Sequence, residues 1–384
     1  MMAAADDALL DDPYAPFRTL DLLGHEAAER EVLDAWNSGR MHHAWLISGQ
    51  RGIGKATLAY RIARFVLAQG NVDAGQGGAA EDAGPGLFGD ALPAPESAAP
   101  ASLDLPEDHP VVRRVSAGGH GDLRVVKREV QEKTKKLQTV INVESVRGVG
   151  SFLSMTSAEG GWRIVLIDGA EDMNVSAANA VLKVLEEPPR RALLLLVTHN
   201  PARLLPTIRS RCRRLPLRPL EAGTVQTLLA RHKPQLSDAD RAALAAMGEG
   251  SVGRALELEE QGGLDLYRDL IKLLQGLPRL DVAGLHALAE KLSKGDHGFR
   301  IAADLFTWWL GRVIRAKGSG VVEPEVVPGE AALTQRLAAA GALEQWVQVW
   351  EKISHLFDRT QAVHLDKKQA LISAFLAVER LVRA

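Results

Sequence analysis

Three short apolar segments limit the folds open to this chain more than any other feature. They are Ala44–Ser48 (AWLIS), Arg163–Asp168 (RIVLID) and Leu193–Thr198 (LLLLVT), and helical segments separate them. An apolar strand without polar alternation is typical of a parallel sheet whose two faces are both covered by helices. We therefore predict an α/β core built on a parallel sheet.

Helices and one further strand are expected around these segments. The spacing of apolar residues predicts helices at residues 25–40, 56–68, 144–155 and 175–187. Pro188 and Pro189 end the last of these helices, because proline cannot continue a helix and disfavours the helical conformation before it. A short strand is expected at 141–143, and an exposed basic helix at 124–136.

The composition changes twice along the chain. Residues 69–109 are rich in Gly, Ala and Pro and contain eight acidic residues but no lysine or arginine. Such a segment buries too little apolar surface to offset its ordering entropy, so we predict a disordered insertion. Beyond Pro219 only helical periodicity continues. We expect an α/β core at 1–217, a small helical domain at 218–262 and an all-helical domain at 263–384.

Charge and cysteine content exclude several classes of protein. The chain of 384 residues has 46 basic and 48 acidic residues, so any contact with nucleic acid must come from a local basic face. The single cysteine, Cys212, excludes an internal disulfide framework and a multi-cysteine zinc module. No apolar run approaches the ~18 residues of a membrane helix. Aspartates occupy the N-terminal segment, where a signal peptide carries positive charge, so we expect a cytoplasmic protein.

A phosphate-binding loop is the strongest short motif. Residues Gly49–Thr57 (GQRGIGKAT) match the pattern G-x-x-x-x-G-K between a predicted strand and a predicted helix. Gly49, Gly52 and Gly54 allow backbone N–H groups to surround phosphates, and Lys55 would reach the β- and γ-phosphate oxygens. The N-terminal dipole of the following helix adds to the attraction, so we predict an ATP-binding site.

Two positions depart from the pattern of a hydrolysing site. Ala56 follows Lys55, where a hydroxyl normally holds Mg²⁺, and Thr57 lies about 100° further around the helix. Asp168 ends a strand that resembles a Walker B strand, in which the aspartate supports Mg²⁺. The next residue, Gly169, has no side chain to act as a base, and general-base catalysis needs one within hydrogen-bond reach. We expect nucleotide binding with weak Mg²⁺ binding if any, and little or no hydrolysis.

Longer motifs resemble the clamp-loader subunits of bacterial DNA polymerase III, which are AAA+ proteins. Residues 167–189 (IDGAEDMNVSAANAVLKVLEEPP) and 204–212 (LLPTIRSRC, ending in the SRC motif) carry the resemblance. The segment 39–46 (GRMHHAWL), which leads into the phosphate loop, agrees with it. The resemblance covers most of residues 20–260. It implies an AAA+ core followed by a helical lid at 218–262 and an oligomerising collar at 263–384.

Within this family the chain resembles the delta-prime type, because the motor type keeps the hydroxyl and the glutamate that Ala56 and Gly169 replace. The resemblance implies that Arg211 acts in trans as an arginine finger in a neighbouring subunit's ATP site. Gly250–Arg254 resembles the sensor 2 motif, which implies that Arg254 contacts bound phosphate. The implied partners are motor subunits and a delta subunit in a hetero-pentamer that loads a sliding clamp on primed DNA.

Other functions remain compatible with the sequence. One is a motor-type ATPase of the same family that hydrolyses ATP alone. Another is an autonomous single-stranded-DNA-binding protein that uses the basic run Lys127–Lys136. A third is a scaffold that binds no nucleotide. Relatives often carry a cysteine cluster where this chain has its cysteine-free insertion, so we expect no zinc. Glu171 and the polar residues Thr198–Asn200 after the apolar strand are given no firm role.

Overall fold

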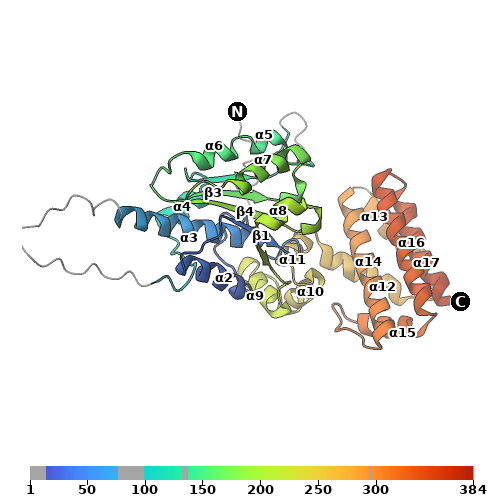
Figure 1. Ribbon diagram of the computed structural model, residues 1–384. Coiled ribbons are helices and arrows are strands. Elements are labelled where there is room, and N and C mark those ends of the chain that lie inside the picture. The colour runs from blue at the N-terminus through green and yellow to red at the C-terminus, as the bar shows by residue number, and fades with distance from the viewer. Residues whose placement is uncertain (1–13, 77–98, 132–136, 294–295, 384) are drawn as a thin grey trace, which may run out of the picture. The chain divides into compact units, whose positions relative to one another are not determined.

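The computed structural model describes residues 14–76, 99–131, 137–293 and 296–383 (Figure 1). The chain divides into two compact units. The first contains the residues up to Thr224 together with Ser251–Gly253, and the second contains Val225–Gly250 and the chain from Arg254 onward.

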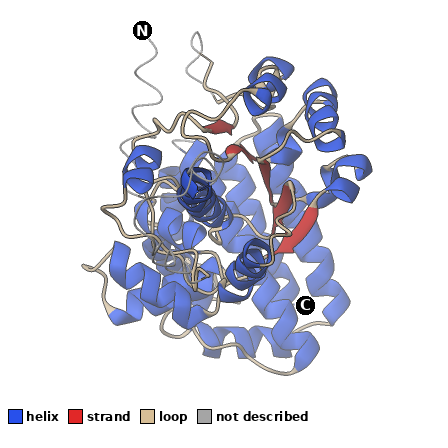
Figure 2. Cartoon of the chain, turned by 60° about the vertical axis from the view of Figure 1, so that its left-hand side comes forward, coloured by secondary structure: helices blue, strands red, loops and turns tan. Residues whose placement is uncertain are grey.

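Five parallel strands form the sheet of the first unit, in the order β2-β3-β4-β1-β5. Figure 2 shows the strands in red among the blue helices. The central strand β4 is buried along its whole length, as its apolar sequence requires. The predicted parallel sheet is therefore confirmed. The strands are β1 (Ala44–Ser48), β2 (Leu123–Val126), β3 (Arg163–Asp168), β4 (Ala192–Thr198) and β5 (Arg213–Pro216).

Successive residues of each central strand enter two different apolar layers. Trp45 and Ile47 of β1 lie in one layer, and Ala44 and Leu46 lie in the other. Because helices cover both layers, the strands need no polar face. The first layer packs against α2 (Glu26–Asn37), α3 (Lys55–Gln76) and α4 (Pro110–Ser116), and the second against α5 (Val143–Val146), α6 (Val149–Ser154), α7 (Val175–Glu186) and α8 (Pro206–Arg211).

Two predicted elements are wrong. The exposed helix expected at 124–136 is not formed at its described residues 124–131, since Leu123–Val126 is strand β2 and pairs with β3; residues 132–136 lie outside the described part. Pairing at the sheet edge outweighs the local helical pattern, which illustrates how strongly strand formation depends on context. The strand expected at 141–143 is reduced to a single bridge between Ile141 and Met173, because helix α5 already begins at Val143.

Two predicted boundaries also differ from the structure. The helix expected at 144–155 is two short helices, α5 and α6, interrupted near Gly148. A Cβ atom at Gly148 would lie 2.5 Å from a guanidinium nitrogen of Arg124, so the glycine makes room for this side chain. The helix after the phosphate loop continues to Gln76, beyond the expected end at 68. The insertion at 69–109 therefore begins later than predicted, and its residues 77–98 lie outside the described part.

The second unit consists of helices and contains no strand within the described residues. At its centre Phe306 contacts the rings of Trp309, Phe357 and Phe375, with centroid distances of 4.9–6.2 Å. The expected helical C-terminal part is confirmed. The helices are α9 (Ala222–His232), which begins in the first unit, α10 (Asp238–Gly248), α11 (Val252–Glu260), α12 (Gly263–Gln275), α13 (Val282–Ser293), α14 (Asp296–Ser319), α15 (Glu330–Ala339), α16 (Leu343–Ala362) and α17 (Lys367–Arg383).

A buried polar group links three segments of this unit. The Tyr267 hydroxyl donates a hydrogen bond of 2.7 Å to Glu330, and Arg312 forms an ion pair of 2.8 Å with the same carboxylate. All three residues are buried, and Arg312 also pairs with Glu323 at 2.8 Å, so the buried polar groups are satisfied within this cluster. Across the ranges that the structure describes, no helix is both long and apolar enough to cross a membrane.

Candidate functional site

The predicted phosphate loop lies between β1 and α3, as its sequence pattern requires. Gly49 has φ +151°, and a Cβ atom there would lie 2.6 Å from the carbonyl oxygen of Leu217. Gly52 and Gly54 have φ values of +76° and +99°, in the region that favours glycine. The backbone path of the loop therefore depends on its glycines.

Three hydrogen bonds hold the loop from different sides. His25 donates through Nε2 to the carbonyl of Ile53 at 2.6 Å, and the Gly253 N–H donates to the carbonyl of Gly52 at 2.9 Å. Lys55 Nζ donates to the carbonyl of Gln50 at 2.5 Å. A Cβ atom at Gly253 would lie 2.9 Å from Gly52 Cα, so the glycine of the predicted sensor 2 motif permits this close approach.

Lys55 lies with two carboxylates in a small charged cluster. Burial lowers the pKa of Lys55, while the negative charges of Glu171 and Asp168 act in the opposite direction. Burial raises the pKa of Asp168, and the charge of Lys55 opposes that rise. The first unit thus brings the predicted loop lysine and the predicted Walker B aspartate together. A cluster of this kind can position a polyphosphate and a cation associated with it.

The backbone after Asp168 turns sharply at Gly169. Its φ of +83° lies in the left-handed region, and a Cβ atom would be 3.1 Å from Oδ2 of Asp172. A residue with a side chain would be strained there. The conformation that positions Asp168 at the strand end is therefore one that favours glycine over the glutamate of a hydrolysing subunit.

Glu171 has a structural role that sequence reasoning did not identify. Its side chain is fully buried, and Oε1 accepts hydrogen bonds from the backbone N–H groups of His199 at 2.8 Å and Asn200 at 3.2 Å. His199 Nδ1 is 2.6 Å from the same oxygen. Burial alone would raise the pKa of Glu171, but its backbone hydrogen bonds and the Thr198 hydroxyl outweigh burial and lower it. Glu171 therefore fixes the loop after β4.

The two residues after Lys55 differ in exposure. Ala56 is partly exposed but has no hydroxyl, whereas Thr57 has a hydroxyl but is only 9% exposed. The position next to the loop lysine therefore provides no oxygen for a cation. Among the described residues, no group of three or more His, Cys, Asp or Glu side chains could hold a metal ion.

Arg211 is the last residue of α8 and is partly exposed. Its guanidinium forms an ion pair of 3.0 Å with Glu186 and donates a hydrogen bond of 3.1 Å to the carbonyl of Thr207. Cys212, the next residue, is buried, and burial raises the pKa of its thiol to about 12. The SRC motif thus combines one buried anchor with one arginine at the surface.

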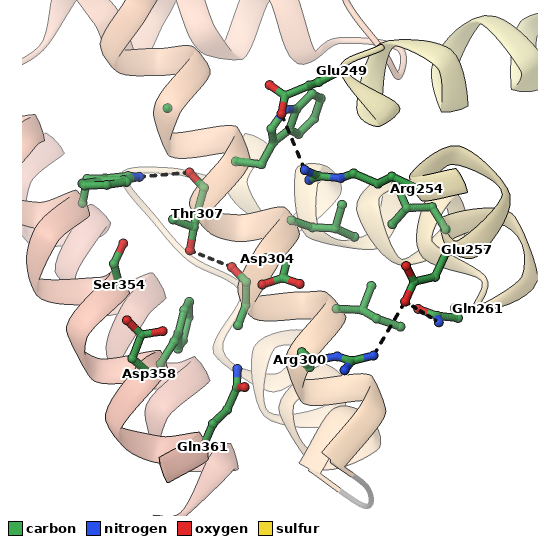
Figure 3. A pocket seen from close by; sticks show the side chains of 18 of the residues that line it. Glu249, Arg254, Glu257, Gln261, Arg300, Asp304, Thr307, Ser354, Asp358 and Gln361 are labelled. Carbon is green, nitrogen blue, oxygen red and sulfur yellow. Dashed lines mark hydrogen bonds and ion pairs between the residues drawn. The ribbon is translucent and has the colours of Figure 1, made fainter. Parts of the chain in front are cut away.

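Arg254 belongs to the second unit, where it lines a cleft of about 610 Å³ between α11, α14 and α16. Figure 3 shows its guanidinium directed toward Glu249, with which it forms an ion pair of 3.5 Å. Arg300 lines the same cleft, 3.8 Å from Glu257. The structure therefore assigns Arg254 a carboxylate partner within its own unit.

Comparisons with known proteins bear on the family. The family model described as "DNA polymerase III, delta subunit" matches residues 102–221. DNA polymerase III subunit delta' of Pseudomonas aeruginosa is 33% identical over 243 residues, which are 63% of this chain and 63% of that protein. Subunit delta' of Yersinia pestis is 28% identical over 335 residues, 86% of each protein. The chain is similar to subunits of DNA polymerase III, above all to the delta' subunits. The expected resemblance to the delta-prime type is confirmed.

These matches cover the chain unevenly. The match spans 63% of the P. aeruginosa protein, less than two thirds of its length. The range of the family model contains Asp168, Gly169 and Arg211 but not the phosphate loop. Among solved structures, a DNA polymerase III gamma subunit-related protein of Thermotoga maritima aligns with a TM-score of 0.36 at 19% identity, covering 92% of this chain and 100% of that chain.

Proposed function

We propose that this chain is a clamp-loader subunit that donates Arg211 to the ATP site of a neighbouring motor subunit and hydrolyses little or no ATP itself. One observation carries the proposal: the residue after Asp168 is a glycine in a left-handed conformation. A general base must lie within hydrogen-bond reach of the attacking water, and Gly169 has no group that could do this.

The remaining groups support nucleotide binding more than hydrolysis. Loop N–H groups and Lys55 would hold the phosphates, and Asp168 would support Mg²⁺. Ala56 removes the hydroxyl ligand that motor subunits use. Glu171 is not a substitute base, because its Oε1 already accepts hydrogen bonds from the loop after β4. ATP is therefore the proposed ligand, with weak Mg²⁺ binding and no zinc.

The proposed role of Arg211 follows from its chemistry and position. A guanidinium is always charged and presents a rigid set of donors that suits phosphate oxygens. Arg211 is partly exposed at the end of a helix whose Ile208 is fully buried, so its backbone is anchored while its side chain reaches solvent. An anchored backbone with an exposed guanidinium suits a residue that contacts a partner subunit. We therefore assign the arginine-finger role to Arg211.

The proposed partners follow from the family. The chain would assemble through residues 263–384 with motor subunits and a delta subunit in a hetero-pentamer. That complex would open a sliding clamp and close it on primed DNA in the cytoplasm, as part of the polymerase holoenzyme. In this arrangement the chain needs no catalysis of its own, because its contribution is the surface and the arginine that it offers to the adjacent motor.

Replacement of Arg211 tests this function. In a complex reconstituted with motor and delta subunits, Arg211→Ala should leave assembly intact but lower DNA-stimulated ATP turnover. The adjoining site would lose a group that contributes roughly 10³–10⁵ in rate. Single-turnover ATP hydrolysis resolves that site from the others. Arg203→Ala, an exposed arginine on the same unit, is the matched control. Unchanged hydrolysis in Arg211→Ala would contradict the proposal.

A further inference from the structure

Both terminal nitrogens of Arg211 are held by groups of this chain. Nη1 donates to the carbonyl of Thr207, one turn earlier in α8, and Nη2 lies 3.0 Å from Oε1 of Glu186. The two charged side chains are 38% and 46% exposed, so neither is enclosed by the protein. The guanidinium is thus held at the surface by two contacts within this chain.

Glu186 is itself well placed to act as a fixed support. Glu186 is the last residue of α7. The two preceding residues, Val184 and Leu185, are buried in the second apolar layer of the core. The next residue, Glu187, closes the helix with a hydrogen bond from its N–H to the carbonyl of Lys183. Prolines follow at once, so the helix cannot extend and its end has a defined position.

The two contacts leave donors available for a ligand. A guanidinium carries five N–H donors in one plane, and Thr207 and Glu186 take one each. Three donors therefore remain, which is enough for bidentate contact with a phosphoryl group. A long arginine side chain that is free in solution would lose rotamer entropy when it binds, whereas one that is already held loses less.

We propose that Glu186 is a positioning residue that holds Arg211 extended for delivery to the neighbouring subunit's ATP site. This inference rests on the proposed arginine-finger function. An exposed ion pair of this kind is worth about 0.2–1 kcal/mol, which corresponds to a change of roughly 1.5- to 5-fold. Loss of Glu186 should therefore cost far less than loss of Arg211 itself.

The experiment uses the reconstituted complex and separates kcat from KM for ATP. Glu186→Ala should lower the single-turnover rate at the adjoining site by about 1.5- to 5-fold, with KM and assembly unchanged. Glu186→Gln keeps an acceptor oxygen and should recover part of the rate. Glu187→Ala removes the same charge one residue away. Glu187 has no side-chain hydrogen bond or ion pair in the described part of the chain, so this control should match wild type.

A double-mutant comparison distinguishes the positioning role of Glu186 from the arginine-finger role of Arg211. If Glu186 acts only through Arg211, then Glu186→Ala should have no further effect when Arg211→Ala is already present. An effect of Arg211→Ala without any effect of Glu186→Ala would overturn the positioning role and leave the finger intact. A faster rate in Glu186→Ala would also overturn it, because Glu186 would then restrain the arginine. No effect of Arg211→Ala would instead refute the proposed function.

Discussion

Gly169→Glu would restore the glutamate of a motor subunit, and we predict that it destabilises the protein without creating an ATPase. The backbone at Gly169 has φ +83°, which costs a residue with a Cβ atom about 1–2 kcal/mol. The new Cβ atom would also lie 3.1 Å from a carboxylate oxygen of Asp172, tighter than ordinary contact. A loss of about 1–3 kcal/mol is expected from this combination.

Thermal unfolding measures the loss directly. For a unit of about 150–250 residues, each kcal/mol lowers Tm by about 2–4 °C, so the expected fall is roughly 2–12 °C. Gly169→Ala carries the same backbone strain without a new charge and should account for most of the fall. Gly119→Ala is the matched control, because Gly119 has no positive φ and a Cβ atom there would meet no other atom within 4 Å.

Steady-state ATP hydrolysis by the isolated variant completes the test. We expect no turnover above that of wild type, since Ala56 still provides no hydroxyl for Mg²⁺ and the strained backbone misplaces any new base. A Gly169→Glu protein that is as stable as wild type and hydrolyses ATP would refute the reasoning. It would mean that the backbone turn tolerates the glutamate and that one residue alone separates this chain from a motor.

Two further predictions concern buried carboxylates. Because the pKa of Glu171 is lower in the folded protein than in the unfolded chain, its contribution to stability is complete above the unfolded value of about 4.3 and is lost as pH falls through the folded value. Glu171→Gln should therefore lose less unfolding free energy between pH 7 and pH 3 than wild type, as measured by urea titrations at each pH. An equal loss of unfolding free energy in the two proteins would contradict this. Glu330→Ala removes the acceptor of the buried Tyr267 hydroxyl and one of the two carboxylates that pair with Arg312. It should destabilise the helical unit by about 1–3 kcal/mol, against almost no change for the exposed Glu344→Ala. Calorimetry of both variants measures this difference, and equal stability would refute it.

The sequence predicted the features that depend on local pattern. Strands β1, β3 and β4 are apolar along their length because both faces of the sheet are covered, so they are visible without any tertiary information. The phosphate loop is visible because its glycines and lysine have fixed spacing. Strand β2 was missed because Arg124 and the basic residues that follow suggest an exposed helix, and only pairing with β3 selects the extended form.

The side-chain contacts of Glu171 and Glu186 join residues that are far apart in the chain. Glu171 binds a loop 28 residues later, and Glu186 meets an arginine 25 residues later, with no periodicity to reveal either pair. The left-handed conformation of Gly169 could not be predicted from the sequence either. A glycine permits many backbone conformations, and its presence does not say which one the chain adopts. Local sequence patterns therefore predicted the central strands and the phosphate loop, while the fold determines what each residue contacts.

The most direct measurement compares ATP turnover by the isolated protein with turnover by the reconstituted complex. We predict that the isolated chain hydrolyses ATP no faster than its Lys55→Ala variant, whereas the complex hydrolyses ATP at a rate that depends on Arg211. Sustained hydrolysis by the isolated chain, lost in Lys55→Ala, would contradict the central claim and identify a motor subunit instead.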